Sequence, residues 1–478
     1  MAAHYKDGNK ADAVALGGAI ASRRISARKA MQAAIAMAEA NTHLGALAVF
    51  DPELGLAQAE AMDAAMAADP IGFRTRPFAG LPTLAKDLGG PFKGIPLRLG
   101  SERFRDKTKS DADSDLAERF RAAGFCLFGS TSAPEFGLSL STEPLGMPPC
   151  RNPLATDRIA GGSSGGAAAA VASGIVAIAH ATDAGGSIRV PAACCGLIGL
   201  KPSRGAMPGG PGFANNLGGV ASEFVIARSI RDAGVAFNQL AGQPKGPYPE
   251  PHFAEANQGR YRIGVLEDFG NAFALDDTRG ATIAEAARAL QDSGHSIEVL
   301  GWGEIEEAAL ASSMTFKAII AANLASLFEG DVALNRLEPM TKAAIAYGRG
   351  LSGATLWRAM EKIATVSHAL WRLFDRFDLI LAPMLSSAPP LLGHFPTDHD
   401  DYEGHIAKMS AFAPLATLAN VAGAPALTLP FGQDEDGLPV PLQIFAPMGC
   451  EALLIAIGSQ LEAQGRWSHT FPIAGLPQ

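Results

Sequence analysis

Two glycine–serine clusters joined by a charge-free segment constrain the fold of this chain more than any other feature. The first cluster reads GGSSGG over residues 161–166 and the second reads AGGS over residues 184–187, so Ser187 follows Ser163 by 24 residues. A single run of this kind is usually a flexible loop, but residues 167–179 between the clusters carry no charge and are rich in alanine. Two runs joined by such a segment are hard to explain as flexible linkers. Each run places a serine hydroxyl among residues that let the backbone bend sharply and bring its N–H groups close to a ligand.

Composition allows a large buried core and argues against several classes of protein. The chain has 478 residues, of which 48% are hydrophobic and 18% are charged, so disorder is not expected. A net charge of −9 gives no electrostatic reason to bind nucleic acid or an anionic membrane. The first residues lack the apolar core of a signal peptide, and residues 167–179 are too short to span a bilayer.

The cysteines point to a reducing compartment. There are five of them, and no pair has the C-x-x-C spacing of a zinc site. We therefore expect buried free thiols, a cytoplasmic protein, and neither a metal nor a cofactor.

Helical and strand patterns alternate along the chain. Ser26 is a candidate N-cap for a helix over residues 27–40, and Gly124 ends a second helix ahead of a buried strand at residues 126–128. A strand, a helix and a strand follow between residues 261 and 300. This alternation predicts an α/β protein. We expect one domain over residues 1–478, with a catalytic core at about residues 70–240 and a more helical, cap-like region at about residues 304–371.

The second cluster has the composition of an anion-binding turn. The backbone N–H groups of Ala184, Gly185, Gly186 and Ser187 can converge on one point and stabilise the oxyanion of an acyl-transfer reaction, in which the Ser187 hydroxyl would be the nucleophile. The same Gly-Gly-Ser sequence is also a common structural turn, so both interpretations stay open at this point.

Two further sites accompany that turn. Ser163 and Ser164 precede an alanine run that favours a helix, so either hydroxyl lies near a helix N-terminus or simply caps it. Lys86 ends a short apolar strand before a polar turn, and a lysine there is usually a solvated surface charge. To act as a base near neutral pH, its pKa must fall by roughly three units from about 10.4, through burial and nearby helix dipoles.

Taken together, these segments closely resemble the amidase signature family. The resemblance rests on Lys86-Asp87, on both clusters, on residues 182–189 and on residues 199–205, and it extends upstream to residues 134–137 and downstream to residues 437–440 with Gln443. It covers roughly residues 11–447. The resemblance implies an α/β amidase signature fold, in which helices surround a central twisted mixed β-sheet.

The resemblance also implies a mechanism. Ser187 is then the nucleophile, Ser163 is a bridging serine after a cis peptide bond, and Lys86 is the base. Asp183 and Arg189 brace the nucleophile loop, and Ser164 supports the site. A carboxylic amide, small and linear or cyclic, is hydrolysed through an acyl-enzyme. A homodimer is expected, and neither nucleic acid nor membrane is expected as a partner.

Three residues that differ from the usual family pattern indicate which subgroup of the family this chain resembles. Ala181 stands where a glycine is common, Ala184 replaces the commoner threonine, and His180 precedes them. With Cys194-Cys195, these residues resemble the subgroup that contains aminohexanoate cyclic-dimer hydrolase. We expect His180 to be a packed, hydrogen-bonded histidine and not a catalytic one.

Two alternatives stay open. Gly161-x-Ser163-x-Gly165 also fits the nucleophile elbow of α/β-hydrolases, with His295, His368 or His405 as candidate bases, although that interpretation leaves Lys86 and the second cluster unexplained. The second alternative is the glutaminase-type, ammonia-donating subunit of a tRNA-dependent amidotransferase. In either form of amidase, we expect substrate choice to come from residues 137–147, 215–219, 314–323 and 385–405.

Overall fold

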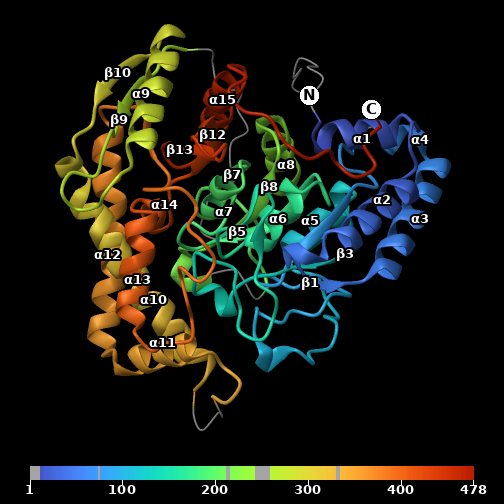
Figure 1. The fold of residues 1–478 in the computed structure, drawn as a ribbon, viewed down its shortest axis with the longest axis horizontal. Coiled ribbons are helices and arrows are strands. Elements are labelled where there is room, and N and C mark those ends of the chain that lie inside the picture. Colours follow the sequence, from blue (N-terminus) through green and yellow to red (C-terminus); the bar gives the residue numbers. More distant parts are fainter. Residues whose placement is uncertain (1–10, 74–75, 212–215, 243–258, 330–333, 478) are drawn as a thin grey trace.

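A mixed β-sheet runs through the centre of the molecule (Figure 1). The structure is a computed structural model and describes residues 11–73, 76–211, 216–242, 259–329 and 334–477. The sheet has eight strands, in the spatial order β10 (Ser296–Val299), β9 (Arg262–Val265), β11 (Leu379–Pro383), β13 (Pro439–Phe445), β12 (Ala426–Gln433), β7 (Ile198–Lys201), β8 (Ser222–Ala227) and β6 (Ile178–Asp183).

Strand direction changes across this sheet. β10, β9 and β11 are parallel, and every later pair is antiparallel. Helices surround it, so the predicted fold class, a mixed sheet enclosed by α-helices, is confirmed.

The two faces of the sheet carry separate apolar layers. On β11, Leu379 and Leu381 join the larger buried cluster, whereas Ile380 and Ala382 join a second one, as the two-residue period of a strand requires. The larger cluster includes buried residues of α8 (Ile230–Leu240), α9 (Asp277–Asp292) and α15 (Glu451–Glu462), and the second includes residues of α12 (Gly353–Phe374) and α14 (Ala416–Ala422). A short helix, α7 (Arg189–Cys194), packs against β7, β12 and β13.

A smaller sheet lies beside the edge strand β6. It has the order β1 (Leu47–Phe50), β3 (Cys126–Thr131) and β2 (Pro82–Lys86), and β2 is parallel to β3. The Thr83 hydroxyl donates to the Ile178 carbonyl at 2.9 Å, which ties β2 to β6. Helices of the N-terminal part and a short hairpin complete this region: α1 (Ala13–Ala21), α2 (Ala27–Ala40), α3 (Pro52–Ala68), α4 (Pro70–Phe73), α5 (Asp115–Ala123), α6 (Gly165–Ala172), β4 (Arg151–Asn152) and β5 (Ala155–Ile159).

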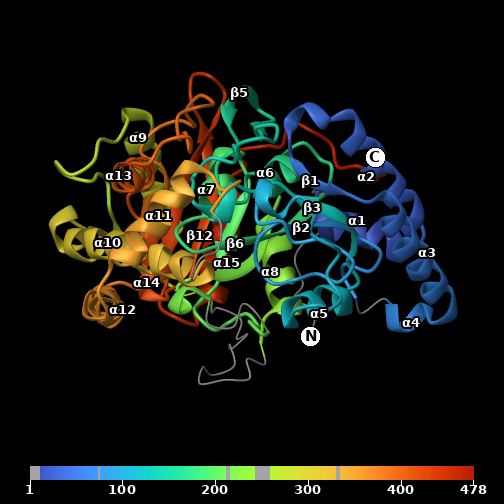
Figure 2. The ribbon, with the colours of Figure 1, turned by 90° about the horizontal axis from the view of Figure 1, so that it is seen from below.

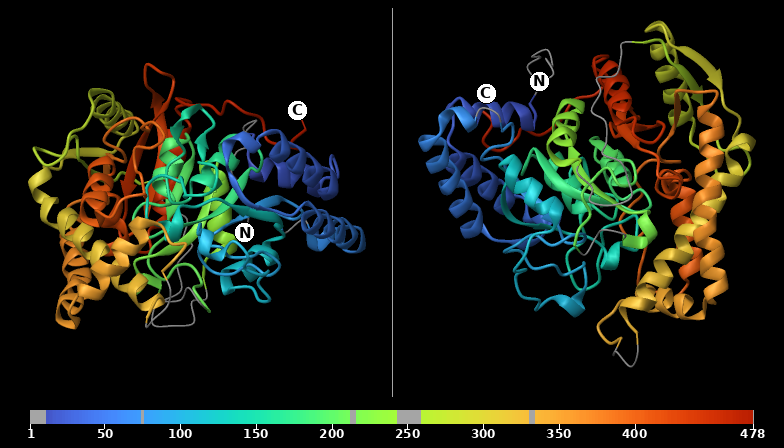
Figure 3. Two further views of the ribbon diagram at one scale, coloured as in Figure 1. Left: turned by 60° about the horizontal axis from the view of Figure 1, so that its bottom comes forward. Right: turned by 180° about the vertical axis from the view of Figure 1, so that it is seen from behind.

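Four further helices lie at the opposite end of the molecule from α1–α4, as Figure 2 and Figure 3 show. They are α10 (Glu306–Leu327), α11 (Pro339–Gly350), α12 and α13 (Tyr402–Phe412). Among the described residues, α10 is the one helix whose length and composition would let it cross a membrane, with a mean hydropathy of 1.3 in its most apolar window. Of that window 56% is buried inside the fold, where α10 packs against α11, α12 and α14.

Local sequence signals explain several of these boundaries. The Ser26 hydroxyl accepts from the Lys29 N–H and begins α2, as predicted. The Ser114 hydroxyl caps α5 in the same way, and Gly124, at φ 95°, ends that helix in the left-handed region. The strand, helix and strand expected between residues 261 and 300 are β9, α9 and β10.

Candidate active site

Lys86 is a buried lysine at the end of β2. Its side chain is 1% exposed, and its Nζ donates at 2.8 Å to both Ser163 Oγ and Thr182 Oγ1. Burial lowers the pKa of Lys86 to about 7, against the opposing effect of the negative charges of Asp183 and Glu223. A substantial part of the lysine is therefore neutral near neutral pH, which a proton acceptor requires.

The first cluster passes directly into α6. Ser163 follows a cis peptide bond from Gly162, and Ser164 occupies the N-cap position of α6. The Ser164 hydroxyl does not cap the helix. It donates to the Thr182 carbonyl at 3.2 Å, and the Ser164 N–H donates to the Ser187 carbonyl at 3.3 Å. Ser164 thus joins the two clusters, and Ser163 is left facing Lys86.

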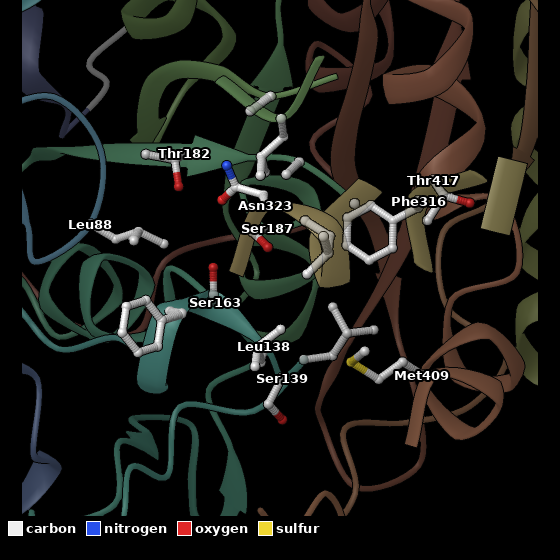
Figure 4. A pocket seen from close by; sticks show the side chains of 18 of the residues that line it. Leu88, Leu138, Ser139, Ser163, Thr182, Ser187, Phe316, Asn323, Met409 and Thr417 are labelled. Atoms are coloured by element: carbon white, nitrogen blue, oxygen red, sulfur yellow. The ribbon is translucent and has the colours of Figure 1, made fainter. Parts of the chain in front are cut away.

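The second cluster turns from β6 into α7. Ser187 is 7% exposed, and together with Ser163, Ala184 and Gly185 it lines one cavity. In Figure 4 the hydroxyls of Ser163 and Ser187 face the same space. Gly186 differs from its neighbours, because its N–H donates to Asp183 Oδ1 at 2.7 Å and it does not line the cavity. The N–H of Gly186, one of the predicted oxyanion donors, thus already has a hydrogen-bond partner in this structure.

A buried ion pair holds this turn in place. Arg189 Nε donates to Asp183 Oδ2 at 2.9 Å, and both side chains are fully buried. Although burial acts to raise it, the charge and hydrogen bonds of Arg189 lower the pKa of Asp183 to about 2. Asn420 of α14 donates to Asp183 Oδ1 at 3.0 Å and accepts from Arg189 at 2.7 Å, and Gln443 of β13 also accepts from Arg189.

His180 lies behind Lys86 and outside the reaction space. Its side chain is fully buried, and its Nδ1 accepts from the backbone N–H of Lys86 at 3.0 Å. Its Nε2 lies 3.2 Å from Oε1 of the buried Glu223, and Phe92 and Phe120 pack against the ring. The expectation of a packed, hydrogen-bonded histidine is confirmed.

The cavity above the two serines has a volume of about 290 Å³. No histidine is among the described residues that line it. His405 is buried against the Leu138 carbonyl, 3.1 Å from its Nε2, and His295 lies 2.8 Å from Gln460. His368 is exposed on α12, so among the described residues none of the three histidines that the α/β-hydrolase alternative offers as a base lines the cavity with Ser163.

Three of the four segments expected to select substrate do line this cavity. They contribute Gly137, Leu138, Ser139 and Leu140, then Leu217, and then Phe316, Ile320 and Asn323. Residue 215 lies outside the described residues. The expectation for residues 385–405 is wrong, because the lining residues Ile406, Met409 and Ser410 come from α13, just after that segment.

Three residues of the candidate active site were given no role by the sequence analysis. Thr182 was part of a motif without a role, but its hydroxyl is the second acceptor for the Lys86 ammonium group. Asn420 lies 231 residues from Arg189 and carries no local signal. Glu223, a buried acid on β8, was also unassigned. The hint for Glu223 was a charged residue directly before the apolar run of residues 224–227 in the same strand.

Comparisons with known proteins identify the family of this chain. The Amidase family model matches residues 29–455. The chain is 33% identical to the putative amidase AmiC of Mycobacterium tuberculosis (strain ATCC 25618 / H37Rv), over 96% of this chain and 95% of that protein. It is also 33% identical to the 6-aminohexanoate-cyclic-dimer hydrolase of Paenarthrobacter ureafaciens, over 82% and 84% of the two chains.

Solved structures give the same result. A 6-aminohexanoate cyclic dimer hydrolase complexed with substrate matches with a TM-score of 0.87 at 29% identity, covering 98% of this chain and 99% of that one. A bacterial aryl acylamidase of the amidase signature family matches with a TM-score of 0.83 at 27% identity, covering 95% and 96%. The predicted resemblance is confirmed: the chain belongs to the amidase signature family, whose members hydrolyse amide bonds.

Proposed function

We propose that the protein hydrolyses the amide bond of a small molecule through a relay from Ser187 to Ser163 to Lys86. The observation that carries this proposal is the buried Lys86 Nζ, 2.8 Å from Ser163 Oγ, with its pKa near 7. A lysine with an ordinary pKa would be almost fully protonated near pH 7 and could not accept a proton.

The proposed relay moves a proton from Ser187 through Ser163 to Lys86 and later returns it. Neutral Lys86 accepts the proton of Ser163, which accepts the proton of Ser187 as Ser187 Oγ attacks the amide carbonyl carbon. The tetrahedral oxyanion is stabilised by backbone N–H groups of Ala184, Gly185 and Ser187. Collapse breaks the C–N bond, and the proton returns through Ser163 to the leaving amine. Water then attacks the Ser187 ester and releases the carboxylic acid.

The surrounding residues hold this geometry in the proposed mechanism. Thr182 Oγ1 accepts from Lys86 Nζ and so aims the lysine at Ser163. Asp183 and Arg189 fix the turn that presents Ser187, because the Asp183 carboxylate accepts from the N–H groups of Gly186 and Ile188 as well as from Arg189.

The volume of the cavity and the names of the relatives support a small amide as the substrate. A cavity of about 290 Å³ fits a small organic amide. Relatives at 33% identity bear the names amidase and 6-aminohexanoate-cyclic-dimer hydrolase. A glutamyl-tRNA(Gln) amidotransferase chain from Thermotoga maritima shares 22% identity at a TM-score of 0.73, a likeness that speaks for the fold alone.

The test is amine release from a panel of aliphatic, aryl, amino-acid and lactam-derived amides by purified protein without a partner. Ser187→Ala serves as the blank, and Lys86→Ala tests the base. We expect both variants to lose turnover while keeping the wild-type fold by circular dichroism. Turnover retained by Ser187→Ala would exclude the relay. Activity that appears only with a tRNA-binding partner would favour the amidotransferase alternative.

We also propose a cytoplasmic location. It is supported by the cysteines, since all five are free and four of them are buried, as in a reducing compartment. Fractionation of the source cell with an antibody to the protein tests this location.

A further inference from the structure

The wall of the cavity is uncharged. Of the described residues that line it, none is Asp, Glu, Lys, Arg or His. Aliphatic and aromatic side chains dominate the lining, among them Leu88, Leu138, Phe316, Ile320 and Met409. A charged group that enters such a space loses its hydration and finds no counter-ion.

The face of α10 that forms part of this wall carries no charged side chain. Ser313, Phe316, Ile320, Asn323, Leu324 and Leu327 line the cavity at helical spacing. Lys317 lies within the same segment but is directed elsewhere, because its Nζ donates to Glu403 at 2.6 Å and lies over the Tyr347 ring. Lys317 is therefore already paired, and it is not among the residues that line the cavity.

The hydroxyls distant from the two serines are also paired. Ser313 and Ser410 share a hydrogen bond of 2.8 Å, and Thr417 shares one of 2.7 Å with Ser312. These groups can line the wall without a ligand. Because their hydrogen bonds are made within the protein, these hydroxyls do not require a polar group on the substrate.

Asn323 is the exception. Its carboxamide lines the cavity, the residue is half-buried, and none of the hydrogen bonds among the described residues involves its side chain. Figure 4 shows this carboxamide pointing into the space that Ser163, Ser187 and Thr182 face. A carboxamide carries one acceptor oxygen and two N–H donors, so it can accept the N–H of an amide held at the reacting serine.

We propose that the cavity selects uncharged, apolar amides and that Asn323 is a specificity-determining residue that hydrogen-bonds the scissile amide. Asn323 Oδ1 accepts the substrate N–H, which an ester lacks. This inference rests on the proposed function, because it assumes that Ser187 attacks in this cavity.

The experiment uses four substrates that share a chain length. Hexanoyl p-nitroanilide is the neutral amide, and p-nitrophenyl hexanoate is the matched ester. The ω-aminohexanoyl and ω-carboxypentanoyl p-nitroanilides add a cation and an anion. We expect each charged anilide to have a kcat/KM at least about a hundredfold below that of the neutral anilide, because neither charge finds a partner in the cavity.

Variants of Asn323 separate recognition from folding. Asn323→Leu should lower kcat/KM for the anilide by about tenfold, the effect of one neutral hydrogen bond, and leave the ester within about twofold. Asn323→Asp keeps an acceptor oxygen and adds a charge, so it should raise kcat/KM for the cationic anilide relative to the neutral one. Ser326→Ala, an exposed position on the same helix, is the matched control and should change nothing.

The outcomes are distinguishable. Equal losses on amide and ester in Asn323→Leu, or charged anilides turned over as well as the neutral one, overturn this inference while leaving the relay intact. Turnover of any substrate by Ser187→Ala would instead overturn the proposed function.

Discussion

Lys86 makes the pH dependence of the reaction a quantitative test of the electrostatics. Burial moves its pKa from 10.5 to about 7, a difference of about 3.5 units, or about 5 kcal/mol in favour of the neutral amine. At pH 7 about half of the lysine is then neutral, compared with roughly one molecule in 3,000 for an unperturbed lysine. The neutral amine that accepts the proton is therefore about a thousand times more abundant in Lys86 than in an unperturbed lysine at pH 7.

The pKa of Lys86 also sets the direction in which kcat/KM changes with pH. Because the neutral amine is the active form, kcat/KM should rise tenfold per pH unit below about 7 and level off above it. At pH 6 we expect about one tenth of the plateau value. The measurement is kcat/KM on a neutral amide from pH 5 to pH 9, with buffers of constant ionic strength.

Glu223→Gln is the perturbation that tests the cause. The Glu223 charge acts to raise the pKa of Lys86, so its removal should move the ascending limb to lower pH. Glutamine keeps the oxygen that accepts from the Gly90 N–H at 2.8 Å, which preserves the local geometry. Glu60→Gln is the matched control, because Glu60 is an exposed acid paired with Arg28 on the surface. A wild-type midpoint above pH 9, or a Glu223→Gln midpoint that is unchanged or higher, would refute the reasoning.

Three further predictions concern the support of the nucleophile turn. Arg189→Met leaves the Asp183 carboxylate buried without its cation, and we expect a loss of about 3–5 kcal/mol in the free energy of unfolding, measured by denaturant titration; a loss below about 1 kcal/mol would contradict the assigned pairing. Asn420→Leu leaves buried groups of that pair unsatisfied and should cost about 1–3 kcal/mol together with a fall in kcat; unchanged kcat would show that Asn420 does not position the turn. Gly185→Ala brings a methyl group to 2.8 Å from the Phe316 ring, so kcat/KM should fall about tenfold or more. The double variant with Phe316→Leu should recover part of that loss, and no recovery would place the effect on the backbone instead.

Much of this site was predictable because its signals are local. The two glycine–serine clusters, Lys86 at a strand end and the Ser26 cap each lie within a few consecutive residues, and the structure has the predicted helix or strand at each position. The pairing of Lys86 with Ser163 spans 77 residues, and it was expected only because the family resemblance supplied it.

The remainder depends on tertiary packing that no local pattern encodes. Asn420 lies 237 residues from Asp183 in the sequence and is brought to it by the packing of α14 in the second apolar cluster. The donation of the Gly186 N–H to Asp183 depends on how the turn closes, which the glycine-rich sequence leaves open. The contribution of α13 to the cavity, in place of residues 385–405, likewise follows from where that helix packs.

The most direct test of the account is to locate the acyl group on the enzyme. The protein is mixed with a slowly deacylating p-nitrophenyl ester, quenched in acid within the burst phase, and analysed by intact mass and peptide mapping. We predict one acyl group per chain on the peptide that contains Ser187, and its absence in Ser187→Ala. An acyl group on Ser163, or steady turnover without any acylated peptide, would contradict the central claim that Ser187 is the nucleophile.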